Sequence, residues 1–288
     1  MNKHAFCIMA HKDVEQINCL LSLLDHPEVD IYLHLDKKST ILLSDIATPK
    51  YSKLFLVNRH DVRWGDISIV ETELELFRAV IKSQVNYGRI HLLSAQDMPI
   101  KNISYILGYF ERVENKQVEF INYSENPKET KRLQYYWFCT KHMRKGLMYK
   151  FVRHSLLLVQ KAIRINRLDE SSLTYKYGAE WVSLTLPAVR YLVSEYPKYQ
   201  GVFKHSVCAD ELYKQMLLWG GKFQFSEKGN LRYAIFNGAS PDLVPKEKLN
   251  ELYSNPDILF ARKFDMCESD VIDSVKYYLQ NLDKKETI

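Results

Sequence analysis

Five acidic side chains stand where a carboxylate could take part in chemistry: Asp36, Asp66, Asp97, Glu180 and Glu211. A carboxylate can act as a general base by accepting a proton from a hydroxyl nucleophile. Each residue taken alone could equally cap a helix or pair with a cation, so none of them identifies a site by itself. Three of them belong to polar clusters, which are Asp36-Lys37-Lys38, Arg63-Trp64-Gly65-Asp66 and Ser94-Ala95-Gln96-Asp97.

These clusters follow segments that the apolar pattern predicts to be β-strands. Apolar runs predict strands at 4–10, 30–35, 54–57 and 89–94, and helical spacing predicts helices at 15–24 and 69–83. Strands that alternate with helices indicate a mostly parallel sheet with helices on both faces. Ligands of such sheets bind beyond the carboxyl ends of the strands, so a nucleotide is expected there. Neither the Gly-x-Gly-x-x-Gly nor the P-loop fingerprint occurs in the chain.

The second half of the chain carries further elements of the same kind. The patterns predict strands at 182–185 and 231–236, a helix at 187–195 and a helix at 212–219. Cys208-Ala209-Asp210-Glu211 opens the last of these helices, with acidic residues at its N-terminus, where the helix dipole favours them. The sequence thus predicts an α/β fold throughout.

Composition excludes several classes of protein. The chain has 288 residues with a net charge of +5, and 46% of its residues are hydrophobic and 26% charged. Disordered, collagenous and coiled-coil chains do not have this composition. The five cysteines are scattered without a Cys-x-x-Cys pair, which argues against a zinc ribbon or a disulfide framework. No signal peptide or membrane-spanning run is recognisable, so the expected compartment is the cytoplasm.

The positive charge is concentrated in one segment. Between Thr130 and Leu168 there are ten basic residues and no acidic one, so the rest of the chain carries −5. Apolar residues are interleaved with these cations, which is typical of a membrane-surface helix or an anion-binding face. An ordinary solvent-exposed helix is the alternative. A nucleic-acid-binding face is a further one, because Tyr135, Tyr136, Trp137 and Phe138 could stack on bases.

Seven short motifs, in order along the chain, resemble the core-2/I-branching glycosyltransferase family, which includes the protein xylosyltransferases. The resemblance covers about residues 5–275 apart from the basic segment. Its motifs are Phe6-Cys7-Ile8-Met9-Ala10-His11-Lys12-Asp13, Asp30-Ile31-Tyr32-Leu33-His34-Leu35-Asp36-Lys37, Val62-Arg63-Trp64-Gly65-Asp66-Ile67-Ser68, Leu92-Leu93-Ser94-Ala95-Gln96-Asp97-Met98-Pro99-Ile100-Lys101, Gly178-Ala179-Glu180-Trp181, Asp210-Glu211 and Phe260-Ala261-Arg262-Lys263-Phe264-Asp265.

The resemblance implies a single GT-A-like domain over residues 1–288. Its parts would be a nucleotide-binding half at 1–110, a basic amphipathic insertion at 130–168 and an acceptor and catalytic half at 175–270. It further implies an inverting transfer from a UDP-sugar, with no metal ion and no other cofactor. A base must then accept the proton of the acceptor hydroxyl, and cations must neutralise the leaving diphosphate.

The resemblance also assigns roles to individual residues. Glu211 matches the catalytic base, while Arg232 and Lys263 match the cations that neutralise the diphosphate, with Arg262 as an alternative to Lys263. Further matches to the donor-binding positions are Asp36, Lys37, Arg63, Trp64, Gly65, Ser94 and Asp97. Asp97 could instead cap the helix expected at 104–110. Glu180 matches the acceptor-binding acid of the xylosyltransferases, and Trp181 could stack on a sugar or simply fill the core.

The acceptor implied by the resemblance is a glycan or a lipid-linked saccharide, as in the synthesis of a surface polysaccharide. A lipid-linked acceptor would give the basic segment a reason to contact an anionic membrane surface, such as the inner face of the plasma membrane. No nucleic-acid partner is expected, because the rest of the chain is net acidic. A protein that binds nucleic acid or membrane through residues 130–168 without catalysis is the alternative function.

Overall fold

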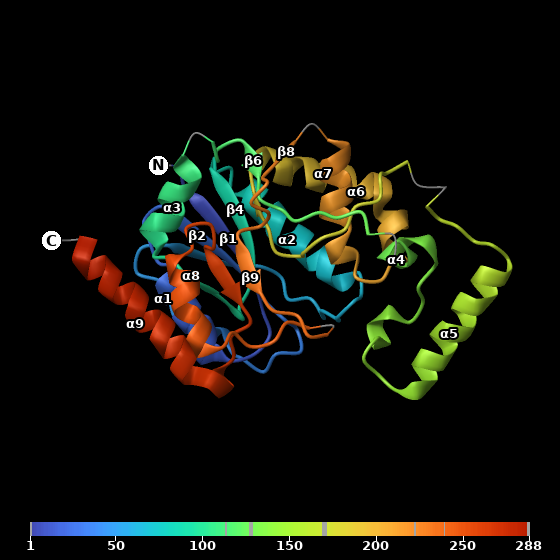
Figure 1. Cartoon of the computed structure of the whole chain (residues 1–288), viewed down its shortest axis with the longest axis horizontal. Helices are drawn as coiled ribbons and strands as arrows, with labels where there is room; N and C mark the ends of the chain where they lie inside the picture. The colour runs from blue at the N-terminus through green and yellow to red at the C-terminus, as the bar shows by residue number, and fades with distance from the viewer. Residues whose placement is uncertain are drawn as a thin grey trace.

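The structure, a computed structural model, describes residues 2–112, 114–126, 129–168, 172–221, 223–238 and 240–286. Within these residues the central feature is a five-stranded sheet in the order β3-β2-β1-β4-β7 (Figure 1). Its parallel strands are β1 (His4–Ala10), β2 (Val29–Leu35), β3 (Lys53–Leu56) and β4 (Arg89–Ser94), and β7 (Ser183–Leu184) is antiparallel to β4. The predicted α/β class, with a mixed and mostly parallel sheet flanked by helices, is confirmed.

Helices cover both faces of this sheet because successive side chains of a strand point to opposite sides. In β1, Ala5 and Cys7 join one core cluster, with α2 (Ser68–Lys82), α6 (Leu186–Lys204) and α7 (Tyr213–Gly220). Phe6, Ile8 and Ala10 join a second cluster, with α1 (Val14–Leu23) and α3 (Ile103–Glu111). The continuous apolar run of this strand is therefore explained by burial on both sides.

Two smaller sheets and the C-terminal helices complete the body. β5 (Asp97–Pro99), β10 (Phe260–Arg262) and β9 (Arg232–Ala234) form a three-stranded sheet, and β6 (Val118–Glu119) pairs with β8 (Gln224–Phe225). A third apolar cluster joins β10 to α8 (Leu249–Ser254) and α9 (Ser269–Glu286). This small sheet matters for the site, because β10 carries Arg262 and leads into Lys263.

Two predicted boundaries differ from the structure by two residues or more. The helix predicted at 187–195 extends to Lys204 and contains Pro197. A proline inside a helix removes one backbone hydrogen bond, but Tyr196 and Phe203 on either side of it are buried and stack on each other at 6.0 Å between ring centroids. The strand predicted at 231–236 is shorter, because only Arg232–Ala234 pairs with β10.

The basic segment forms helices at the edge of the molecule. It contains α4 (Lys131–Gln134), a 3-10 turn at Thr140–His142 and α5 (Leu147–Ala162). Figure 1 shows α5 at the rim, on the opposite side of the body from α9. Across the described residues, no helix combines the length and the apolar character that crossing a membrane requires.

Candidate active site

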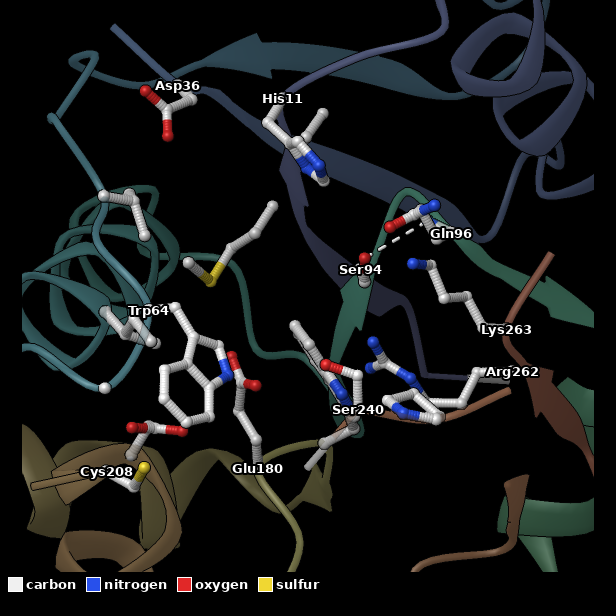
Figure 2. A pocket seen from close by; sticks show the side chains of 18 of the residues that line it. His11, Asp36, Trp64, Ser94, Gln96, Glu180, Cys208, Ser240, Arg262 and Lys263 are labelled. Carbon is white, nitrogen blue, oxygen red and sulfur yellow. Dashed lines mark hydrogen bonds between the residues drawn. The ribbon is translucent and has the colours of Figure 1, made fainter. Parts of the chain in front are cut away.

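A pocket of about 490 Å³ lies at the carboxyl ends of the parallel strands. His11 follows β1, Asp36 follows β2 and Ser94 ends β4, and all three line the pocket. Figure 2 shows His11 and Asp36 at one end of the pocket and Glu180 and Cys208 at the other. The topology thus brings together motifs that are more than 160 residues apart in the chain.

Nine of the thirteen site residues predicted from the sequence line this pocket. They are Asp36, Trp64, Gly65, Ser94, Glu180, Trp181, Glu211, Arg262 and Lys263. The other four, Lys37, Arg63, Asp97 and Arg232, do not belong to its lining.

Arg63 and Arg232, which lie outside the lining, have other partners. Arg63 pairs with Asp61 at 2.8 Å, and the neighbour of Lys37, Lys38, lines the pocket in its place. The Arg232 guanidinium donates to the carbonyl oxygen of Val182 at 2.7 Å and to Ser183 Oγ at 3.0 Å. In this arrangement Arg232 connects β9 to β7. The sequence led us to expect its guanidinium in the pocket, but Arg232 does not belong to the pocket lining.

Asp97 supports the pocket from within the protein. It is buried, accepts a hydrogen bond from the Ser94 backbone N–H at 2.9 Å and lies 3.4 Å from the Arg262 guanidinium. Burial raises the pKa of Asp97, and the positive charge of Arg262 opposes that rise. The helix-cap alternative is wrong, because Asn102 caps α3 through the Tyr105 N–H at 2.8 Å.

Arg262 and Lys263 form a cationic wall of the pocket. The Arg262 guanidinium lies 4.6 Å from the ring centroid of Trp181, so that residue supports the arginine as well as lining the pocket. Lys263 points toward Ser94 and Gln96 (Figure 2). Within the described chain Lys263 has no ion-pair partner, so its charge is available to an anion in the pocket.

The opposite rim combines Trp64 and Gly65 with residues from the basic segment. The Arg144 guanidinium lies 4.6 Å from the centroid of the Trp64 ring and donates to Ser240 Oγ at 2.9 Å. Gly65 has a φ of +73°, and a Cβ there would lie 3.4 Å from the side chain of Met143. Glycine is therefore favoured both by the left-handed backbone and by the close approach of the basic segment.

Three carboxyl groups line the pocket at the Glu180 end, those of Glu180, Asp210 and Glu211. Burial raises the pKa of Glu180 well above its usual value, and the negative charges of Asp210 and Glu73 act in the same direction. Asp210 is only 4% exposed, and one of its carboxyl oxygens has no hydrogen-bond partner among the described residues. Burial raises the pKa of Asp210 to about 7, with further contributions from Glu211 and Glu73. Burial therefore favours the protonated forms of Glu180 and Asp210 more than water does.

Glu211 lies in a 3-10 turn, Ala209–Glu211, and not inside the following helix as predicted. Its carboxylate pairs with Arg132 of the basic segment, and Arg132 also pairs with Glu129 at 2.6 Å. A fully buried ion pair between Lys214 and Glu73 lies behind this turn, and Lys214 donates to the Asp210 carbonyl oxygen at 2.9 Å. The turn that carries Asp210 and Glu211 is thus fixed from both sides.

Comparison with known proteins identifies the family. Residues 4–247 match the model of the Core-2/I-Branching enzyme family. The chain belongs to this family. A xylosyltransferase of Ciona intestinalis is 21% identical over 289 residues, which cover 90% of this chain and 32% of that protein, so the chain spans about a third of the relative's length. Mouse xyloside xylosyltransferase 1 aligns with a TM-score of 0.39 and 12% identity, covering 91% of this chain and 97% of the mouse chain.

In this family member, several pocket residues escaped the sequence reasoning. They are His11, His34, Lys38, Gln96, Arg144, Cys208, Asp210 and Ser240. His11, His34, Gln96 and Asp210 lie inside the motifs quoted above, so the motifs themselves contain the signal for these residues. Arg144 belongs to the basic segment, but nothing near it in the sequence indicates that it lines the pocket, which it reaches from a distant part of the chain. Among the described residues no three His, Cys, Asp or Glu side chains are grouped as metal ligands would be.

The raised pKa of Asp210 predicts a pH-dependent stability. Since the ordinary value is 3.8 and the folded value about 7, the folded chain binds an extra proton between these pH values, and the free energy of unfolding falls as pH rises through them. Between pH 5 and pH 8 the free energy of unfolding of the wild type should fall by about 3 kcal/mol relative to that of Asp210→Asn. Urea unfolding at both pH values measures this. Asp61→Asn, at an exposed carboxylate, is the control, and a pH-independent difference for Asp210→Asn would contradict the prediction.

Proposed function

We propose that this protein is an inverting glycosyltransferase. In the proposed reaction a sugar such as N-acetylglucosamine or xylose passes from a UDP-sugar to a hydroxyl of a glycan or lipid-linked saccharide, forming a β-linkage. The observation that carries the proposal is a pocket whose lining contains both the carboxyl groups of Glu180 and Glu211 and the cations of Arg262 and Lys263. A base for the nucleophile and cations for an anionic leaving group are the two requirements of this displacement.

The acidic end of the pocket would activate the acceptor. Glu211 accepts the proton of the attacking hydroxyl, and its pairing with Arg132 fixes the orientation of the carboxylate. The raised pKa of Asp210 reduces the negative charge beside that base near neutral pH. Glu180 would hold the acceptor by a hydrogen bond to another hydroxyl, and Trp181 lies next to it in the lining.

The cationic wall would stabilise the leaving UDP. Arg262 offers a planar pair of donors and Lys263 a point charge, a combination that suits the two phosphates. Because Arg262 lines the pocket and Arg232 does not, we assign this role to Arg262 and Lys263. Arg232 then acts indirectly, by tying β9 to β7 beside β10.

The experiment that tests the proposal is thermal stabilisation by a panel of UDP-sugars, followed by a UDP-release assay. A donor that binds the folded chain should raise the melting temperature in a saturable manner, and the best binder should release UDP when an acceptor is added. UDP alone should stabilise the chain, because the cationic wall would bind its phosphates. Stabilisation by neither UDP nor any UDP-sugar would refute the proposed donor class.

Metal independence follows from the role given to Arg262 and Lys263. Transfer should therefore proceed at the same rate in EDTA as in buffer containing manganese. The rates of UDP release under both conditions measure this, with a commercial manganese-dependent transferase as the positive control for chelation. Loss of activity in EDTA that manganese restores would show that the two cations do not suffice.

A further inference from the structure

Helix α5 has the opposite burial pattern to an ordinary surface helix. Its large apolar side chains are exposed, and polar side chains face the protein. Leu147, Met148 and Phe151 are 84%, 67% and 72% exposed, whereas the buried residues of the helix are the polar Arg153 and Gln160. Figure 1 shows α5 standing at the rim of the molecule. Monomeric proteins seldom expose clustered large apolar side chains without a binding partner.

The exposed apolar residues form one continuous surface. At 3.6 residues per turn they cover about half of the helix circumference without a charged residue between them. We call this surface the apolar arc, and it consists of Leu147, Met148, Phe151, Val152, Leu156, Leu158, Val159 and Ile163. An arc this wide is typical of helices whose apolar face is buried in something.

The protein holds α5 through polar contacts on the opposite side. Gln160 exchanges two hydrogen bonds with the backbone of Tyr136, at 2.7 and 2.9 Å, and Arg153 donates to the carbonyl oxygens of His142 and Met143 at 3.3 Å each. These bonds fix the rotation of the helix about its axis. The apolar arc is consequently directed outward by the fold and is not left exposed by loose attachment.

Cations border the apolar arc. Lys150 and Lys161 lie on α5 beside one edge of the arc. Lys141 and Lys145 precede the helix, and Arg164 follows it. Within the described residues the ion pairs of this segment are those that Arg132 forms with Glu129 and Glu211, so the five exposed cations have no acidic partner. We call these five residues the basic flank. It leaves uncompensated positive charge next to exposed apolar area.

We propose that α5 docks on an anionic lipid bilayer, with the apolar arc among the acyl chains and the basic flank at the headgroups. This combination is what an interfacial helix requires. A second copy of the chain would cover the arc but would bring two acid-free basic segments together, and like charges in contact are unfavourable. A nucleic acid would pair with the cations but would leave the arc in water.

The docking surface is connected to the pocket. Arg144 lines the pocket and lies three residues before α5, and Thr140 of the same segment donates to Asp66 at 2.5 Å. A docked α5 would therefore hold the pocket rim near the membrane surface. If the proposed function is correct, this position gives access to a lipid-linked acceptor, but the docking itself does not depend on catalysis.

Co-sedimentation of the full chain with vesicles tests the docking. The wild type should bind vesicles of phosphatidylcholine and phosphatidylglycerol and should bind pure phosphatidylcholine at least tenfold more weakly. Lys150→Gln/Lys161→Gln should weaken binding to the anionic vesicles about 30-fold, from a roughly fivefold effect per lysine. Phe151→Ser/Val159→Ser should weaken it at least tenfold. Since these side chains are exposed, the melting temperature should not change.

Matched controls exist on the body of the protein. Lys53→Gln/Lys82→Gln removes the same charge from β3 and α2, and Tyr277→Ser removes a ring on α9 that is exposed to the same extent as Phe151. Neither should alter vesicle binding. Equal binding by wild type and both α5 variants would overturn the proposal. So would retention on DNA without vesicle binding, or a concentration-dependent dimer that Phe151→Ser/Val159→Ser abolishes in the absence of vesicle binding. No substrate is present, so failure here is distinct from failure of the proposed transferase reaction.

Discussion

Replacing Glu211 with glutamine is expected to lower the turnover of sugar transfer about 10²- to 10⁴-fold, the usual contribution of a positioned general base. Glutamine keeps the size of the side chain but cannot accept the proton of the acceptor hydroxyl. UDP binding should stay within about twofold, because Glu211 pairs with Arg132 and the phosphates would be bound by Arg262 and Lys263. Single-turnover kinetics with saturating donor, together with calorimetric titration of UDP, would measure the two effects separately.

Glu129→Gln is the matched control for this variant. Glu129 is the other carboxylate that pairs with Arg132, but it does not belong to the pocket lining. Its loss changes the charge around Arg132 without removing the base, so turnover should fall far less. Near wild-type turnover of Glu211→Gln would show that another group accepts the proton. Asp210→Asn and Glu180→Gln would then be the variants to compare, because both carboxyls face the same pocket.

Replacing Lys214 with methionine is expected to reduce the free energy of unfolding by about 3–5 kcal/mol. Lys214 and Glu73 are fully buried and lie 2.5 Å apart, and the Tyr213 hydroxyl donates to the same carboxylate at 2.6 Å. Removing one partner leaves the other ionisable group in the core without its counter-charge. Burial already raises the pKa of Glu73, which would consequently take up a proton when Lys214 is absent. Urea unfolding at pH 7 measures the loss.

Two further variants interpret that result. Lys198→Met breaks an exposed pair with Glu195 at 2.7 Å and should cost less than about 1 kcal/mol. Glu73→Gln/Lys214→Met removes both charges and should recover part of the stability, because no buried carboxylate then has to take up a proton. The idea of an essential buried pair fails if Lys214→Met costs no more than Lys198→Met.

The Lys214 variant also bears on the site. Because Lys214 donates to the carbonyl oxygen of Asp210, its loss should loosen the turn that presents Asp210 and Glu211. The contact between Arg132 and Glu211 fixes the same turn from the basic segment. Residues far apart in the chain, in α2, α4 and α7, therefore determine the position of the proposed base.

The amino-acid sequence by itself determined the class of fold, the family and most of the pocket. The continuous apolar run of β1 required helices on both faces, and the strand ends then had to carry the polar clusters around Asp36, Trp64 and Ser94. These features are local, or follow from the order of elements along the chain, and motif order reports them directly. The sequence also located the positive charge in residues 130–168.

Only the tertiary structure decided which side chains face one another. Arg262 and Arg232 are both arginines on short strands, yet the pairing of β10 between β5 and β9 places one in the pocket lining and ties the other to β7. Arg132 meets Glu211 across 79 residues, and the burial of Asp210 depends on all the elements around it. The outward direction of the apolar arc is set by two polar side chains of α5. Orientation and burial are collective properties of packing, and local residue patterns do not contain them.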